Sequence, residues 1–156
     1  MEPGWTQMSA DGTSRTAEPS PDDGNRGSHP GLAYGASYVT ILAMPTLREY
    51  LDDHNRSPFA RWLDGLETPA ALKVRTALAR LEAGNTSALK SVGGGVHEVR
   101  IDFGPGYRVY LGLDGADLVI LLGGSAKARQ SAAIADARER WADYRRRKRR
   151  GEQEIG

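Results

Sequence analysis

The sequence predicts an α+β fold with elements in the order β-α-α-β-β-β-α, in which an antiparallel sheet carries an N-terminal helical hairpin and a C-terminal helix. Three observations predict it. Stretches with the length and periodicity of strands gather between residues 96 and 122. Two helix start signals, Ser57-Pro58 and Thr68-Pro69, each precede apolar residues at helical spacing. A further helical stripe occupies residues 126–147.

The first predicted elements are a strand and two helices. TLREYL, residues 46–51, alternates like a strand. Gly84-Asn85 has the composition of a helix end and closes the second helix, so we expect the two helices to form a hairpin behind the first strand. Their apolar faces consist of Phe59, Trp62, Leu63 and Leu66 in the first helix, and of Ala71, Val74, Leu78 and Leu81 in the second.

A loop, TSALKSVGGG at residues 86–95, is expected to lead into the rest of the sheet. The next strand, residues 96–103, alternates with Val99, Ile101 and Phe103 on one face. The turn Gly104-Pro105-Gly106 then joins it to a strand at residues 107–113.

Asp114-Gly115 is a strong turn signal before the last strand, residues 117–122. The continuous apolar run of that strand is typical of a central strand covered on both faces, and Gly123-Gly124 is expected to end it. The final helix follows, with an apolar stripe made of Ile134, Ala137, Trp141 and Tyr144.

The chain of 156 residues is long enough for one domain. Residues 1–43 hold two arginines against five acidic residues, a net charge of −3, and show no sustained apolar period. They are therefore expected to be a disordered extension, followed by a domain at residues 44–148 and a disordered tail at residues 149–156. Met44, where the regular pattern begins, is a candidate for the start of the expressed chain.

Composition excludes several classes of protein. There is no cysteine, hence no disulfide framework and no thiolate chemistry. No run approaches the roughly 18 apolar residues that span a bilayer, so we expect a cytoplasmic protein without a membrane partner. The formal net charge is only +1, which limits nucleic-acid binding to local patches. One such patch, the basic block at residues 145–150, fits either a frayed solvated helix end or a non-specific contact with RNA.

Two arginines are predicted to share one face of the sheet. If residues 104–106 make the turn, Asp102 faces Arg108 and Arg100 faces Tyr110, so these four side chains form one polar patch. Guanidinium groups bind phosphate oxygens with two parallel hydrogen bonds, which makes the patch a candidate phosphate site. The alternative is structural: a cross-strand ion pair of Asp102 with Arg108 and a stacked pair of Arg100 with Tyr110.

Two lysines are predicted to lie near the patch. Lys127 stands at the start of the last helix, whose N-terminal N–H groups favour an anion, and Lys90 precedes the sheet in a glycine-flanked loop. His97 is expected to be packed rather than catalytic. No spacing of His, Asp or Glu is typical of a metal site, so neither a metal nor a cofactor is expected. The run Gly93-Gly94-Gly95 is not a phosphate-binding loop, because it precedes a strand.

The string KSVGGGVHEVRIDFGPGYRVYLGLDGADLVILLGGSAKARQ, residues 90–130, resembles the toxins of type II toxin–antitoxin systems. The similarity is to the RelE/HigB-like "addiction module killer protein" branch of the RelE/ParE superfamily. REYLDDHNRSPFARWLDGL, residues 48–66, and AIADARERWADYRRRK, residues 133–148, resemble the same branch. The motif G-x-G-Y-R, with an upstream Glu-x-Arg and a downstream Gly-Gly-x-x-Lys, carries the resemblance.

The resemblance implies a RelE-like fold and a toxin that cleaves mRNA on the ribosome without a metal and so inhibits translation. By position, it implies Arg100, Arg108 and Lys127 as catalytic residues. It also makes Glu98 a possible general base, with ion pairing to Arg100 as the alternative. The predicted substrate-binding residues are Lys90, Tyr110 and Arg129.

The resemblance also implies a cognate helix-turn-helix antitoxin as partner. One departure concerns the first turn of the last helix, AKARQSAAI, which lacks the tyrosine common in RelE-type toxins and leaves the general base unassigned. Two alternative functions therefore stay open: a ParE-like toxin that acts on DNA gyrase without cutting RNA, and a degenerate toxin that only binds its antitoxin.

Overall fold

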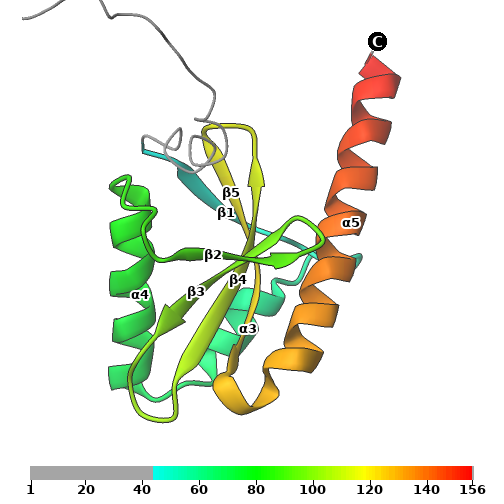
Figure 1. The fold of residues 1–156 in the computed structure, drawn as a ribbon. Coiled ribbons are helices and arrows are strands. Elements are labelled where there is room, and N and C mark those ends of the chain that lie inside the picture. Colours follow the sequence, from blue (N-terminus) through cyan, green and yellow to red (C-terminus); the bar gives the residue numbers. More distant parts are fainter. Residues whose placement is uncertain (1–43, 156) are drawn as a thin grey trace, which may run out of the picture. The chain divides into compact units, whose positions relative to one another are not determined.

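The structure is a computed structural model that describes residues 44–155. The predicted N-terminal extension, residues 1–43, lies outside the described residues. The described elements are β1 (Thr46–Glu49), α3 (Pro58–Asp64), α4 (Thr68–Glu82), β2 (Leu89–Gly93), β3 (Val96–Ile101), β4 (Tyr107–Asp114), β5 (Leu118–Ala126), a 3-10 turn (Lys127–Arg129) and α5 (Gln130–Ile155), as Figure 1 shows.

The sheet is mixed, and the prediction of an antiparallel sheet is wrong. Its strand order is β1-β5-β4-β3-β2, with β1 parallel to β5 and the other pairs antiparallel. The backbone N–H of Thr46 donates to the carbonyl of Asp117 at 2.8 Å, and that of Tyr50 donates to the carbonyl of Leu121 at 2.9 Å. The alternation of a strand shows its faces but not the direction of its partner, so β1 gave no signal of this pairing.

The predicted N-terminal helical hairpin is also wrong. Helix α3 follows β1 and packs on β5, whereas α4 packs on β3, so each helix lies against the sheet rather than against the other. Their apolar faces, which the sequence placed correctly, explain this arrangement because both are buried on the same face of the sheet. The start signals are also as predicted: the Ser57 hydroxyl accepts the N–H of Ala60 at 2.9 Å.

A fifth strand, β2, replaces most of the predicted loop at residues 86–95. It forms a hairpin with β3 in which Leu89 faces Val99 and Lys90 faces Glu98. The turn uses Gly94 and Gly95, whose φ angles of 65° and 83° lie in the left-handed region that glycine adopts without strain. The glycine run that ruled out a phosphate loop is therefore a hairpin turn.

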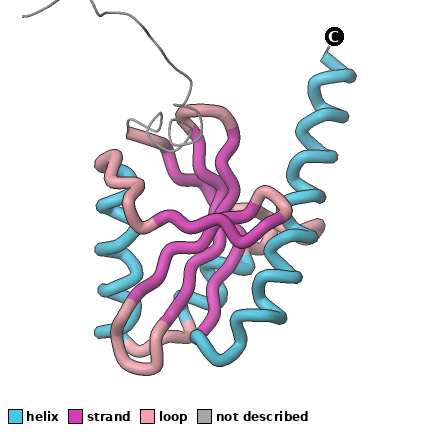
Figure 2. The backbone as a smooth tube through the Cα atoms, viewed as in Figure 1, coloured by secondary structure: helices cyan, strands magenta, loops and turns pink. Residues whose placement is uncertain are grey.

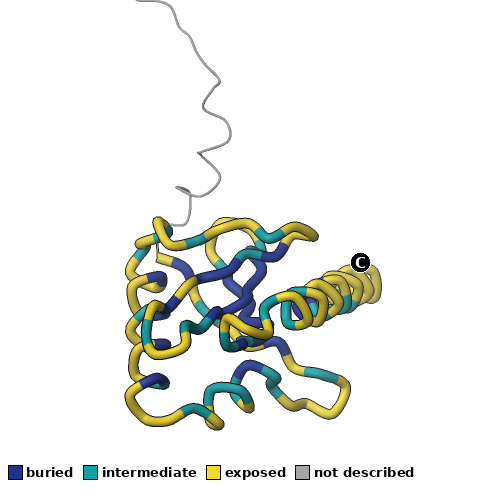
Figure 3. The backbone as a smooth tube through the Cα atoms, turned by 60° about the horizontal axis from the view of Figure 1, so that its bottom comes forward, coloured by how far each residue is buried: buried dark blue, intermediate teal, exposed yellow. Residues whose placement is uncertain are grey.

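The last strand and helix both extend further than predicted. Strand β5 continues through Gly123-Gly124 to Ala126, and a Cβ at Gly124 would overlap the ring of Trp62 on α3, so that position has room only for hydrogen. Helix α5 begins at Gln130 and ends at Ile155, so residues 149–155 are helical rather than a disordered tail. Figures 1 and 3 show the last turns of α5 as an exposed extension beyond the sheet.

The sheet separates two apolar clusters, and helices cover both of its faces (Figure 2). Helices α3 and α4 cover one face, and α5 covers the other. The first cluster contains Phe59, Val74, Leu78, Leu81, Val99, Ile101, Val109, Leu111, Val119 and Leu121. The second contains Tyr50, Val96, Tyr110, Ile120, Leu122, Ala137 and Trp141, with Ile134 and Tyr144 packed against it. The predicted apolar stripe of the last helix is confirmed.

Candidate anion-binding site

Arg100 and Arg108 lie directly opposite one another on β3 and β4. The predicted register paired Arg100 with Tyr110 and Asp102 with Arg108, and it is wrong by two residues. The reason is the turn: Ile101 is the last paired residue of β3, so residues 102–106 all belong to the loop, where Gly106 N–H donates to the carbonyl of Phe103 at 2.9 Å. Because a shift of two residues keeps each side chain on its face, both arginines still lie on the same face of the sheet.

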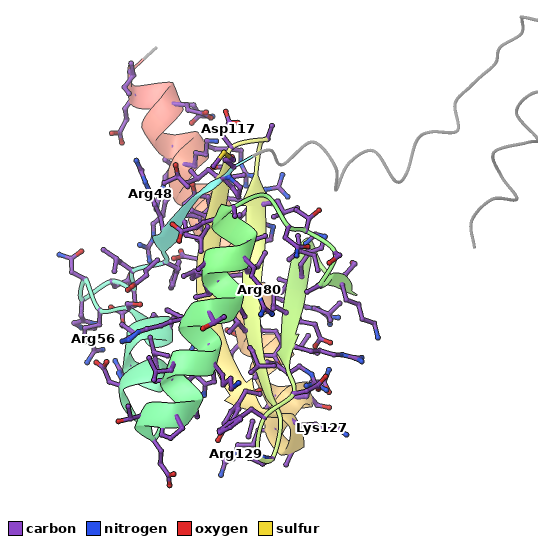
Figure 4. The ribbon with its side chains drawn as sticks, turned by 90° about the vertical axis from the view of Figure 1, so that its left-hand side faces the viewer. Arg48, Arg56, Arg80, Asp117, Lys127 and Arg129 are labelled. Atoms are coloured by element: carbon purple, nitrogen blue, oxygen red, sulfur yellow. The ribbon has the colours of Figure 1, made fainter. Side chains whose placement is uncertain are left out.

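The two arginines line a cavity of about 360 Å³ together with Lys127. The loop from Asp102 to Gly106 forms its rim. Lys127 is held there by its own backbone, whose N–H donates to the carbonyl of Gly106 at 2.9 Å. Figure 4 shows Lys127 and Arg129 at the end of the sheet opposite Asp117. Three cations from β3, β4 and the turn before α5 therefore converge on one concave surface.

Arg108 is the most constrained cation of the cavity. Its residue is only 6% exposed, and its Nη1 donates to the carbonyl of Tyr107 at 3.2 Å. Its Nε is buried without a hydrogen-bond partner among the described residues, 3.7 Å from Oε1 of Glu98. A buried guanidinium with an unpaired donor, set in the wall of a cavity, favours an anionic ligand because the ligand restores the hydrogen bonding lost on burial.

Glu98 lies between the two arginines and is fully buried. Its Oε2 accepts from Nε of Arg100 at 3.2 Å, and its Oε1 accepts from Nε2 of Gln130 at 2.9 Å. Burying a carboxylate is unfavourable unless cations and donors compensate it, and here they do. The charges of Glu98, Arg100, Arg108 and Lys127 add to +2, so the cluster keeps an excess of positive charge.

The predicted substrate-binding residues do not line this cavity in the described structure. Tyr110 is fully buried, its hydroxyl is 3.0 Å from Oγ of Ser125, and burial raises its pKa. Lys90 faces Glu98 from β2 but is exposed, and Arg129 is exposed in the turn before α5. The structure thus unites the three residues expected to be catalytic and leaves Lys90, Tyr110 and Arg129 outside.

Sequence reasoning missed Gln130 and treated Asp102 only as an ion-pair partner. Asp102 is exposed and is the one carboxylate on the cavity wall within residues 44–155. Neither residue carried a signal, because a glutamine in a first helical turn and an aspartate beside a turn are both common on protein surfaces. Only the register of β3 and the position of α5 bring them to the arginines.

Two further classes of site were searched in residues 44–155. No group of three or more potential metal ligands is found there. None of the helices in that part of the chain combines the length and apolar character needed to cross a membrane.

Comparison with known proteins finds one relevant relative. A protein of Haemophilus influenzae, described only as uncharacterized, is 43% identical over 81 residues, which cover 51% of this chain and 82% of that protein. The chain belongs to the same family as this Haemophilus protein. No model of a known protein family matches the chain.

Proposed function

We propose that this protein is the toxin of a type II toxin–antitoxin system and an endoribonuclease that cleaves mRNA. The observation that carries the proposal is the convergence of Arg100, Arg108 and Lys127 on one cavity with an unpaired buried donor. Such a cavity fits the phosphodiester of RNA, whose two non-bridging oxygens match the paired N–H groups of a guanidinium. The resemblance of residues 90–130 to RelE/HigB-like toxins supports the same function.

The proposed reaction is an attack by the RNA itself. The 2′-oxygen forms a bond to the adjacent phosphorus while the bond from phosphorus to the 5′-oxygen breaks, which leaves a 2′,3′-cyclic phosphate. Arg100 and Arg108 stabilise the negative charge that builds on the phosphoryl oxygens, and Lys127 assists the departing 5′-oxygen. The 2′-hydroxyl proton passes to a base, for which Asp102 is the accessible carboxylate of the cavity wall.

The proposed setting is the cytoplasm, with translated mRNA on the ribosome as substrate. Neither a metal nor a cofactor takes part in the proposed reaction. The proposed partner is a helix-turn-helix antitoxin that covers the basic cavity and so neutralises the toxin.

Induction of the protein in bacteria tests the proposal directly. We expect growth arrest with rapid loss of mRNA, and we expect Arg108→Ala to abolish both effects while the protein still folds. DNA-damage signalling without mRNA loss would instead identify a toxin that acts on gyrase. Neither growth arrest nor mRNA loss, with retained binding of a neighbouring antitoxin, would identify a degenerate toxin.

A further inference from the structure

We infer that Glu98 and Gln130 form a buried positioning pair that aims Arg100 and Arg108 at the cavity, and that Glu98 is not the general base. The consequence for catalysis rests on the proposed function. The positioning itself concerns only the arrangement of side chains, so it can be tested whether or not the protein cleaves RNA.

The carboxylate of Glu98 is inaccessible to a substrate. The residue is 0% exposed and does not line the cavity, and both of its oxygens already accept hydrogen bonds, one from Arg100 and one from Gln130. A general base must come within hydrogen-bond reach of the proton that it removes. Glu98 meets the 2′-hydroxyl only if this cluster breaks, whereas Asp102 is already at the cavity wall.

The contacts of Glu98 fix how the guanidinium groups are turned. Both arginines approach the carboxylate through Nε, Arg100 at 3.2 Å and Arg108 at 3.7 Å. A guanidinium held at its Nε side has its terminal nitrogens on the far side, because the group is planar and rigid. The buried carboxylate therefore orients two forks at once, and the fork of Arg108 is further fixed by the carbonyl of Tyr107.

Gln130 connects this arrangement to α5. It is the first residue of that helix, and its amide donates to Oε1 of Glu98 at 2.9 Å across 32 positions of sequence. A neutral donor holds the carboxylate without adding a third charge to the cluster. A longer cation here would compete with the arginines for Glu98, so an amide suits a positioning role better than a lysine or arginine would.

The experiment compares Glu98→Gln and Gln130→Ala with two matched surface controls, Glu82→Gln and Gln153→Ala, all in the full chain. Hydrogen exchange of the Arg100 and Arg108 Nε–H groups is measured by NMR, and thermal unfolding is followed by circular dichroism. We expect exchange in the wild type to be slow, and to speed up by about tenfold or more in the Glu98 and Gln130 variants only. Unchanged exchange in both variants overturns the inference, and if Glu98→Gln fails to fold, Gln130→Ala decides alone.

A second measurement separates positioning from proton transfer. It uses a short RNA with 2′-O-methyl groups, which binds but has no 2′-hydroxyl to react. We expect both variants to weaken its binding by about tenfold, and the pH dependence of cleavage to keep its acid limb in Gln130→Ala. If Glu98→Gln binds this RNA like the wild type but loses cleavage together with the acid limb, Glu98 is the base and the inference fails. If the wild type binds no RNA, the proposed function fails while the exchange result still decides the positioning.

Discussion

Arg100 and Arg108 face each other across β3 and β4, and both contact the same buried carboxylate, Glu98. Like charges directly opposite on a sheet are unfavourable, so this pair exists only because Glu98 lies between them. The arrangement resembles a ligand site more than a structural ion pair, because one carboxylate leaves an excess positive charge beside a cavity. This relationship motivates the prediction for Arg108.

Arg108→Lys keeps the charge but removes the planar fork. We expect RNA cleavage to fall by about 10²–10³-fold, because a lysine cannot replace paired donors aimed at phosphoryl oxygens. The measurement is cleavage of a labelled RNA under single-turnover conditions. Arg75→Lys, on the exposed face of α4, is the control and should cleave normally. Equal activity of the two variants would contradict the role of Arg108.

Gly112 on β4 lies directly under the indole of Trp141 on α5. A Cβ at this position would overlap the ring, so Gly112→Ala is expected to destabilise the protein by roughly 1–3 kcal/mol through overpacking. Chemical denaturation measures the loss. Gly151→Ala is the matched change at an open helical site, where a Cβ meets nothing within 4 Å, and should leave stability unchanged or raise it slightly.

Arg147 ties the segment after β1 to α5. It donates to the carbonyl of Leu51 at 2.9 Å and pairs with Asp53 at 2.9 Å and with Asp143. Asp143 also accepts from the hydroxyl of Tyr50 at 2.8 Å; burial and this bond raise the pKa of Tyr50 to about 12.

We therefore expect Arg147→Ala to destabilise the fold by about 1 kcal/mol, a value reduced by the partial exposure of the arginine. Denaturant unfolding measures it. Arg150→Ala is the control, because Arg150 is exposed on α5 and makes no ion pair within residues 44–155. A similar loss in both variants would show that the effect comes from the helix rather than from the cluster around Asp143.

His97 is expected to make stability depend on pH. Burial lowers its pKa below the ordinary value of 6.5, and its Nδ1 has no hydrogen-bond partner among the described residues. Below pH 6.5 the unfolded chain therefore binds more protons at this residue than the folded protein does. The stability that neutral His97 allows is complete above pH 6.5 and is lost as the pH falls from there through the lower folded pKa.

The measurement is the free energy of unfolding at a series of pH values between neutrality and the range where carboxylates titrate. His97→Gln should flatten the curve in this window, and His54→Gln, at an exposed loop position, should leave it unchanged. A curve that keeps its slope in His97→Gln would assign the pH dependence to other groups.

The exposed end of α5 is expected to contribute to RNA affinity. Three of its cations are held in ion pairs, Arg146 and Arg147 with Asp143 and Lys148 with Asp114 at 2.7 Å, whereas Arg145, Arg149 and Arg150 make none among the described residues. Replacing these three by Gln should lower the dependence of RNA binding on salt by about 0.7 per lost phosphate contact. Arg75→Gln should not change the slope. A triple variant with the wild-type slope would show that α5 does not contact RNA.

Much of the candidate site was predictable because strand periodicity is local. Alternation put Arg100 and Arg108 on one face, and the turn glycines placed them on adjacent strands. A register error of two residues did not disturb this result, since it preserves the face. The roles of Glu98 and Gln130 were not predictable, because they depend on where α5 meets the sheet.

The amino-acid sequence alone determined the apolar faces of the helices and of β3 and β4, the Ser57 cap and the common face of the two arginines, since these depend on neighbours within a few residues. Only the tertiary structure decided that β1 lies parallel to β5, that residues 89–93 form a strand and that Lys127 joins the arginines. Those features arise from pairings between segments far apart in the chain, where direction and partner are set by which buried surfaces fit together rather than by any local pattern.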